Sequence, residues 1–280
     1  DDNFNYNQDY SLLVKKNLSK FFFKTSSYKD SFFMTSGARS SLNIVIKSLD
    51  FNKNSEIIVL GHTCSEVPNV IISNNLKPVY VDINIELLCF TLKDLIKKIN
   101  SKTRAVIIQH HLGFFNYDPK MISFLKEKSI IIIEDCALAL GSKFENINAG
   151  SIGDFAIFSF GKSKTFNAYL GGCILVNNQD FLTNVFLIHK KLPILSNYKN
   201  SFLRFFFKLE NYVYNSSFFK LLIFPLGGLK IIAIVSNINF HLADTKLSSK
   251  IQGYDYILPN YFNFLIYLNI VDLESKVSDK

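Results

Sequence analysis

The chain has 280 residues, of which 48% are hydrophobic and 19% are charged. This composition provides one large apolar core with material for part of a second domain, and it excludes a chain without packed structure. The formal net charge is +8, but the lysines are scattered among asparagines and apolar residues without an arginine-rich stripe. We therefore expect no nucleic-acid partner, since an anionic small substrate explains the charge equally well.

The first pattern along the chain combines small residues with the start of a helix. The spacing of Leu42, Val45, Ile46 and Leu49 predicts one buried helix face. The segment just before it reads Ser36, Gly37, Ala38, Arg39, Ser40 and Ser41. Backbone N–H groups at a helix N-terminus bind anions, so this segment is a candidate phosphate site. The alternative is an ordinary helix N-cap without a ligand.

Further apolar runs have the length and composition of buried strands, and stretches with helical spacing separate them. These runs cover residues 56–60, 78–83, 104–109 and 130–134. Thr91 begins one intervening helix as part of a capping box, and Asp118 begins another with Pro119 at the first helical position. The alternation predicts an α/β fold, with a mostly parallel sheet covered on both faces. Ligands in such folds bind beyond the carboxyl ends of the strands.

Lys164 and Asp135 carry the strongest chemical signal in the chain. Asp135 follows Glu134 at the end of an apolar run, and Lys164 comes shortly after the run at 158–160. A lysine amine forms a Schiff base with an aldehyde cofactor, and a carboxylate keeps the nitrogen of a pyridine ring protonated. Each residue alone is more often a solvated loop lysine or a helix-capping carboxylate. In this order and together, they favour an enzyme that uses pyridoxal 5'-phosphate.

Histidines at two strand ends are candidates for contact with a ligand. His62 follows the run at 56–60, and His110 and His111 follow the run at 104–109. An imidazole there could stack on the cofactor or bind the substrate, and the alternative is a histidine that is satisfied within the structure. The histidines and the four cysteines lack the paired spacing of a metal site, so we expect no metal. Such separated cysteines are typical of reduced thiols in a cytosolic protein.

Several segments in one order resemble the DegT/DnrJ/EryC1/StrS family of sugar aminotransferases. The matching segments are residues 103–113, Glu134 to Ala137, Gly150 to Asp154, Phe158 to Phe160, Lys164, and Gly171 with Gly172. None of them is diagnostic alone, but the ordered set covers about residues 30 to 190. The resemblance implies fold type I of the pyridoxal-phosphate enzymes, with a mostly parallel seven-stranded sheet between helices and a small C-terminal domain.

The resemblance also implies roles for individual residues. Lys164, and not Lys162, would carry the cofactor, and Asp135 would hold the pyridine nitrogen. The expected cofactor-binding residues are Gly37, Ala38, Arg39, Ser40, Cys64, Asp135, Ser159 and Lys164, and the candidate substrate contacts are His62 and His110. The family implies a homodimer that moves an amino group from an amino acid, glutamate above all, to a nucleotide-linked keto sugar. It also implies a role in making sugars for surface polysaccharides, and the separated cysteines indicate a cytoplasmic location.

Some positions depart from the family's pattern. Cys64 stands where the family has an aromatic side chain stacked on the cofactor ring, and Leu138 replaces a glutamine that binds the phenolate oxygen. Asp244 replaces an asparagine that reaches the phosphate of the neighbouring subunit, and Ala38 with Arg39 departs from a Ser-Gly-Thr turn. Two alternatives therefore stay open. One is a catalytically degenerate member that acts as a binding or regulatory subunit. The other is a sugar dehydratase, which ranks third because that branch implies a histidine in place of Lys164.

The family's domain arrangement implies a large cofactor-binding domain at residues 1–240 and the start of a small domain at 241–280. We therefore expect a truncated or incomplete family member. The segment 203–238 is rich in Phe, Leu and Ile, but charges interrupt every stretch of membrane-spanning length. We expect this segment to be buried or covered by a partner subunit. Contact with a membrane interface is the less favoured alternative.

Overall fold

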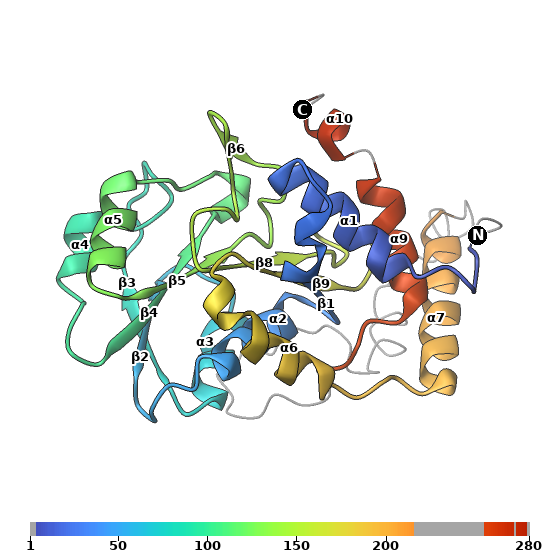
Figure 1. The fold of residues 1–280 in the computed structure, drawn as a ribbon, viewed down its shortest axis with the longest axis horizontal. Coiled ribbons are helices and arrows are strands. Elements are labelled where there is room, and N and C mark those ends of the chain that lie inside the picture. The colour runs from blue at the N-terminus through green and yellow to red at the C-terminus, as the bar shows by residue number, and fades with distance from the viewer. Residues whose placement is uncertain (1–3, 216–254, 272, 279–280) are drawn as a thin grey trace, which may run out of the picture. The chain divides into compact units, whose positions relative to one another are not determined.

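The computed structural model describes residues 4–215, 255–271 and 273–278 (Figure 1). The described residues fall into two units. The larger unit contains residues 4–194 together with those after 254, and the smaller one contains α7 (Asn197–Asn215). The domain boundary expected near residue 240 and most of the segment 203–238 lie outside the described residues, so both expectations stay predictions. None of the described helices is both long and apolar enough to cross a membrane.

The main sheet of the larger unit has seven strands in the order β1-β9-β8-β5-β4-β2-β3. The strands are β1 (Phe32–Thr35), β2 (Glu56–Leu60), β3 (Lys77–Val81), β4 (Thr103–Gln109), β5 (Ile131–Asp135), β8 (Phe155–Ser159) and β9 (Gly172–Val176). Strands β3, β2, β4, β5 and β8 are parallel to one another, whereas β9 runs antiparallel to both β8 and β1. The predicted mostly parallel sheet is therefore confirmed. A separate hairpin consists of β6 (Lys143–Phe144) and β7 (Ile147–Asn148).

Helices lie on both faces of this sheet (Figure 1). Those of the larger unit are α1 (Tyr10–Phe23), α2 (Ala38–Ser48), α3 (Glu66–Ser73), α4 (Leu92–Ile96), α5 (Pro119–Glu127), α6 (Leu182–Lys190), α9 (Asn260–Ile270) and α10 (Leu273–Ser278). Short 3₁₀ turns are η1 (Ser27–Ser31), η2 (His111–Gly113) and η3 (Gln179–Phe181). The expected starts of α4 and α5 are confirmed. Thr91 accepts from the Asp94 N–H, and Asp118 caps α5 with Pro119 in its first turn.

Alternating side chains of the buried strands supply two apolar cores. In β2, Ile57 and Val59 belong to the core beneath α2, α3 and α6, whereas Ile58 and Leu60 belong to the core beneath α4 and α5. Side chains of a strand point alternately to its two faces, so a strand between two helical layers is apolar throughout. This explains why the strand runs of the sequence are continuous rather than alternating.

Residues near the end of the chain pack on the helix near its beginning. Helix α9 lies beside α1 (Figure 1), and the rings of Tyr10 and Phe264 are 4.9 Å apart between centroids. The Tyr10 N–H donates to Asn260 Oδ1 at 3.0 Å. The same helix approaches Gly171, whose φ of +124° suits glycine and where an added Cβ would lie 2.8 Å from Ile266 Cδ1. Helix α9 thus packs against the loop that leads into β9.

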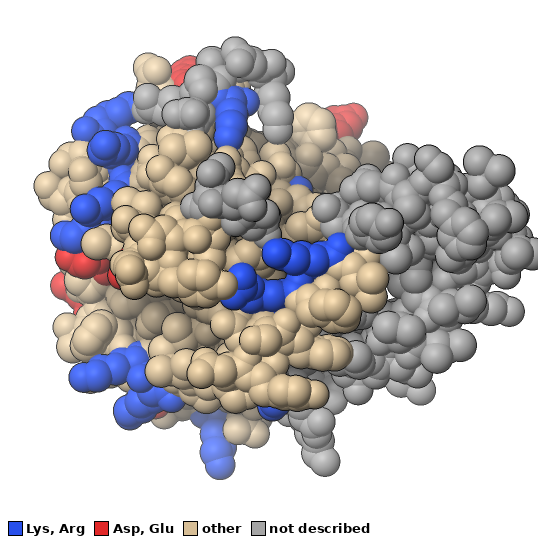
Figure 2. Space-filling model, turned by 90° about the vertical axis from the view of Figure 1, so that its right-hand side faces the viewer, with Lys and Arg blue, Asp and Glu red and all other residues tan. Residues whose placement is uncertain are grey.

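Charged side chains are distributed in groups over the face shown in Figure 2. On the described part of this face, Lys and Arg form separate clusters with uncharged surface between them, and some Asp and Glu lie among them. The arrangement differs from the continuous basic stripe that tracks a nucleic-acid backbone.

Candidate functional site

The carboxyl ends of the parallel strands bring the predicted site residues to one edge of the sheet. His62 follows β2, Asp135 ends β5 and Ser159 ends β8. Because β9 and β1 alternate in direction, the start of β9 and the end of β1 reach the same edge. Gly172 on β9 therefore lies opposite Ser159 on one side and Thr35 on the other. Sequence positions more than a hundred residues apart meet in this way, as the topology predicts.

Asp135 is a buried carboxylate at the centre of this edge. It pairs in register with Gln109 of β4 and Ile157 of β8, and its side chain is among the buried polar groups. Its Oδ1 accepts one hydrogen bond from the Ala137 N–H at 3.0 Å. Burial raises the pKa of Asp135, and the Ala137 N–H and nearby Lys164 only partly oppose this rise. The effect of burial on the pKa of Asp135 is thus larger than the opposing effect of the positive charge around its carboxylate.

Lys164 supplies a cation close to Asp135, since its charge acts on the pKa of that carboxyl group. A turn holds Lys164, whose N–H donates to Gly161 O at 3.1 Å. A Cβ added at Gly161 would lie 3.7 Å from Ser159 Oγ and 3.9 Å from Lys164 Cγ, so both side chains border the same space. Lys164 is half-buried, whereas Lys162 is exposed. The two lysines thus differ in exposure, and the assignment of Lys164 as the reactive amine stays a prediction.

The expected phosphate segment forms the first turn of α2. Gly37 precedes the helix, and the Ser41 N–H makes the first backbone hydrogen bond to Gly37 O at 2.9 Å. The N–H groups before Ser41 have no partner within the helix. Ser40 Oγ is buried and has no hydrogen-bond partner among the described residues. The Arg39 guanidinium forms an ion pair with Glu66 in the first turn of α3, so this side chain links the two helices.

Gly172 lets this turn approach the sheet. A Cβ at Gly172 would lie 2.3 Å from the carbonyl carbon of Gly37 and 2.7 Å from the Ala38 N atom, which no side chain tolerates. A Cβ at Gly37 itself would meet nothing within 4 Å, so space is open on that side of the turn. The glycine pair at 171 and 172 therefore places the α2 N-terminus beside Ser159.

The two neighbouring histidines after β4 have different surroundings. His110 is buried, its Nε2 lies 2.8 Å from Glu134 Oε2, and its Nδ1 accepts from the Asn116 N–H at 3.2 Å. Both ring nitrogens are thus engaged inside the protein, which corrects the expectation that His110 contacts substrate and supports the structural alternative. His111 instead contacts His62, with ring centroids 4.8 Å apart, and interacts electrostatically with Asp135. His62 is exposed, and its expected contact with a ligand stays a prediction.

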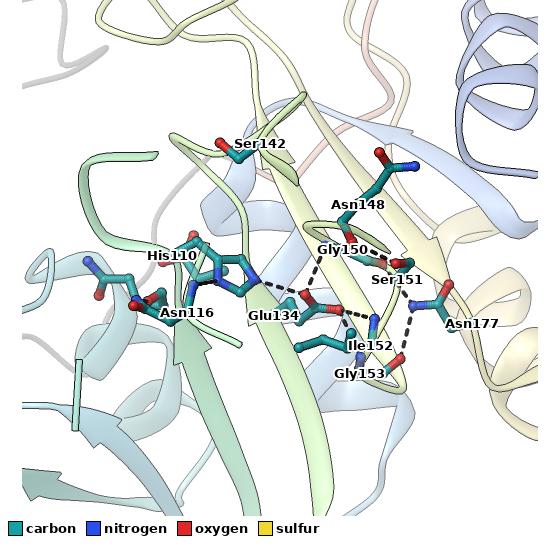
Figure 3. A network of polar contacts seen from close by, with 12 residues as sticks. His110, Asn116, Glu134, Ser142, Asn148, Gly150, Ser151, Ile152, Gly153 and Asn177 are labelled. Carbon is teal, nitrogen blue, oxygen red and sulfur yellow. Dashed lines mark hydrogen bonds and ion pairs between the residues drawn. The ribbon is translucent and has the colours of Figure 1, made fainter. Parts of the chain in front are cut away.

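Glu134 is an internal anchor that the sequence did not reveal (Figure 3). Its carboxylate is fully buried and accepts from the Gly150, Ile152 and Gly153 N–H groups, each at 2.8 Å, besides facing His110. Asn177 Nδ2 in turn donates to Gly150 O and Gly153 O. Glu134 therefore fastens the loop before β8 to the strand that carries Asp135. The sequence signal that could have identified this role is strand alternation. The side chains of neighbouring residues such as Glu134 and Asp135 point to opposite faces of a strand.

The buried group of His110, Glu134 and Cys136 has potential metal-ligand atoms within 4.8 Å of one another. However, the Glu134 oxygens already accept three backbone N–H groups and face the imidazole of His110. Burial and the Glu134 carboxylate raise the pKa of the Cys136 thiol far above its usual range, which disfavours the thiolate that a metal needs. We assign the group a structural role.

The positions at which the sequence departs from the family's pattern have different surroundings in the structure. Cys64 is exposed, and its backbone O accepts from the Val67 N–H at the start of α3. Leu138 is half-buried, and its carbonyl oxygen accepts from Thr165 Oγ1 at 3.3 Å, close to the lysine loop. Asp244 lies outside the described residues, and its expected role stays untested.

Comparisons with known proteins agree with this arrangement. A family model described as the DegT/DnrJ/EryC1/StrS aminotransferase family matches residues 22–203. GDP-perosamine synthase of Escherichia coli O157:H7 is 30% identical over 139 residues, which are 50% of this chain and 38% of that protein. A dTDP-4-dehydro-2,3,6-trideoxy-D-glucose 4-aminotransferase of Saccharopolyspora spinosa is 29% identical over 132 residues, 47% of this chain and 34% of that one. The matched region thus spans well under half of these relatives.

Solved structures share the fold. The Helicobacter pylori aminotransferase PseC, involved in the biosynthesis of pseudoaminic acid, has a TM-score of 0.66 at 17% identity, over 96% of this chain and 59% of that one. NtdA from Bacillus subtilis, solved with bound cofactor PMP, has a TM-score of 0.56 at 20% identity, over 64% of this chain and 39% of the other. At these identities the likeness shows the fold type alone.

Proposed function

Because the chain belongs to the DegT/DnrJ/EryC1/StrS aminotransferase family, we propose that it is a pyridoxal-phosphate-dependent aminotransferase acting on a nucleotide-linked keto sugar. The family's aminotransferases use this cofactor. The observation that carries the proposal is the pairing of a buried carboxylate, Asp135, with the half-buried amine of Lys164 at the carboxyl edge of the sheet. A buried anion beside a lysine, at the edge of the sheet where such folds bind ligands, is characteristic of functional rather than structural charges.

The residues at this edge suit the three parts of the cofactor. Ser40 Oγ is a buried polar atom without a partner among the described residues, at a helix N-terminus suited to a phosphate. Ser159 Oγ borders the same space as Lys164 and offers a second hydroxyl for that phosphate. The excess negative charge of Asp135 suits a protonated ring nitrogen, because a cation there offsets the cost of burying the carboxylate.

The proposed reaction divides its work among these side chains. When bound, the cofactor ring accepts the electron pair released as a proton leaves the amino-acid α-carbon. Asp135 would keep the ring nitrogen protonated, and the α2 N-terminus with Ser159 would fix the phosphate. Lys164 Nζ would hold the cofactor at rest. After the incoming amino donor displaced it from the cofactor, the same nitrogen would take the α-carbon proton and return it to the cofactor, as general base and then general acid.

Finer points of the proposal follow the relatives. Their printed names include GDP- and dTDP-linked sugars, which supports a nucleotide-linked keto sugar as acceptor. We propose glutamate as the amino donor, a homodimer as the active assembly, and a role in surface polysaccharide synthesis. The four free cysteines fit the cytoplasm, which is the location we propose.

A catalytically degenerate binding or regulatory subunit is the second candidate. Two observations favour it, because Cys64 presents no ring to the cofactor and Leu138 offers no side-chain donor to its phenolate oxygen. A dehydratase ranks below both candidates, since Lys164 is present.

The amino-donor half of the reaction tests the proposal. The chain loaded with pyridoxal phosphate is mixed with L-glutamate, and 2-oxoglutarate formed per protein is measured by mass spectrometry. We expect stoichiometric 2-oxoglutarate from the wild type and from Lys162→Ala, and none from Lys164→Ala. If the wild type binds the cofactor but forms no keto acid from glutamate, glutamine or aspartate, the binding-subunit candidate replaces the enzyme.

A further inference from the structure

Two imidazoles in contact with each other lie at the carboxyl edge of the sheet, and the proposed reaction gives them no role. The rings of His62 and His111 are 4.8 Å apart between centroids and meet edge to face at 85°. Such an arrangement is favoured between aromatic rings. His62 follows β2 and His111 follows β4, which are neighbouring strands of the sheet. The contact therefore joins two loops at the candidate site.

Contacts on β4 fix the orientation of His111. Gln109 Nε2 lies 2.9 Å from His111 Nδ1, and Gln109 pairs in register with Asp135 on the adjacent strand. The Asp135 carboxylate is close enough to act on the pKa of His111, and His111 acts on that of Asp135. His111 is half-buried and His62 is exposed, so the two rings lie nearer the surface than the buried Asp135 does.

We propose that His62 and His111 together form an aromatic wall that packs against the planar ring whose nitrogen Asp135 holds. This inference rests on the proposed function, because a pyridine ring bound to Asp135 has to lie among the groups that interact electrostatically with that carboxylate, His111 among them. Cys64, two residues beyond His62, is exposed and has no ring to stack. The two imidazoles thus provide the aromatic surface that this segment lacks at Cys64.

The affinity of this aromatic wall for a protonated pyridine ring depends on the charge state of His111. Burial and the neighbouring His62 lower the pKa of His111, and the Asp135 carboxylate only partly opposes this. Lys164 and the protonated ring are cations that share the single carboxylate of Asp135. A neutral His111 adds no third positive charge, whereas a protonated one repels the ring nitrogen. Ring binding should therefore weaken as the pH falls and His111 takes up a proton.

Pyridoxamine 5'-phosphate is the probe that isolates this contact, because it has no aldehyde and cannot condense with Lys164. Its dissociation constant is measured by fluorescence titration at pH 8 and pH 6 for the wild type, His62→Ala, His111→Leu and His111→Phe. We expect His62→Ala and His111→Leu to bind about 2- to 10-fold more weakly at pH 8, the range of one aromatic contact. His111→Phe keeps a ring without a titrating nitrogen, so it should keep the pH 8 affinity and lose less affinity at pH 6 than the wild type does.

Leu112→Ala is the matched control, since it removes an exposed side chain from the same turn and should leave binding unchanged. Comparing variants at each pH cancels the titration of the probe's own phosphate. Equal unfolding temperatures without ligand exclude misfolding as the cause, and His111→Phe covers the case in which His111→Leu is unstable. If the wild type binds the probe and all variants bind it equally, the wall is refuted while the proposed function stands. If the wild type does not bind the probe, both the aromatic wall and the proposed function are refuted.

Discussion

Replacing Asp135 with asparagine should stabilise the folded chain in the absence of ligand. The same substitution should weaken the binding of the cofactor. Burial raises the pKa of Asp135 above its ordinary value of 3.8, and Lys164 and the Ala137 N–H do not cancel the effect. The folded state therefore binds this proton more tightly than the unfolded state does. Stability falls as the pH rises through the window above 3.8, and at neutral pH the charged carboxylate is a cost.

The size of the effect follows from the same burial. Asparagine keeps the oxygen that accepts from the Ala137 N–H and removes the charge. Each tenfold rise in the proton affinity of Asp135 on folding corresponds to about 1.4 kcal/mol, so removing the charge should raise the free energy of unfolding. In a chain of this size each 1 kcal/mol raises the unfolding temperature by about 2 to 4 °C. With cofactor bound, the substitution should destabilise the chain instead. It removes the charge-assisted hydrogen bond between the carboxylate and the ring nitrogen, which is worth about 1.5 to 3 kcal/mol.

Thermal unfolding followed by circular dichroism, with and without pyridoxal phosphate, measures both effects. The advantage of Asp135→Asn without ligand should shrink as the pH is lowered from 7.5 towards 3.8, because the wild-type carboxyl group, with its raised pKa, becomes protonated on the way. Asp94→Asn is the matched control: the Asp94 carboxylate lies by Lys97, which lowers its pKa, so its loss should not stabilise the chain. A lower unfolding temperature for ligand-free Asp135→Asn, or an unchanged cofactor-induced shift, would refute this reasoning.

Two further substitutions test the surroundings of Asp135. Glu134→Ala leaves three buried N–H groups and His110 without their acceptor, so we expect a loss of roughly 3 to 6 kcal/mol in urea unfolding, whereas a loss below about 1 kcal/mol would show that water replaces the carboxylate. Leu138→Gln should tighten pyridoxal phosphate binding by about 5- to 10-fold in absorbance titrations, since it supplies the missing donor for the phenolate oxygen; unchanged affinity would mean that position 138 does not reach that oxygen.

The fold and the centre of the site could be predicted because strong local signals coincide with strand ends. Continuous apolar runs identified β2, β4 and β5, and strand direction then placed Asp135 and Ser159 at one edge. The lysine assignment followed from the order of motifs, and the different exposure of Lys162 and Lys164 agrees with it.

The histidines show where the sequence was insufficient. His110 and His111 are adjacent, and His111 begins a short turn that includes Leu112 at a φ of +53°. No periodicity applies in such a turn, so the inward and outward residue could not be distinguished. Glu134 was missed for another reason, since the N–H donors to its carboxylate come from a later loop and only strand alternation, which sends its side chain to the face opposite Asp135, distinguishes it in the sequence.

Covalent labelling tests the central claim, that Lys164 is the amine that holds pyridoxal phosphate. The chain is incubated with the cofactor, reduced with borohydride and digested, and the modified peptide is sequenced by mass spectrometry. Lys162 lies two residues away, is exposed, and serves as an internal control for nonspecific labelling. The account predicts one pyridoxyl group per chain on Lys164 Nζ, lost in Lys164→Ala and retained in Lys162→Ala. A label on Lys162, or equal labelling of many surface lysines, would contradict it.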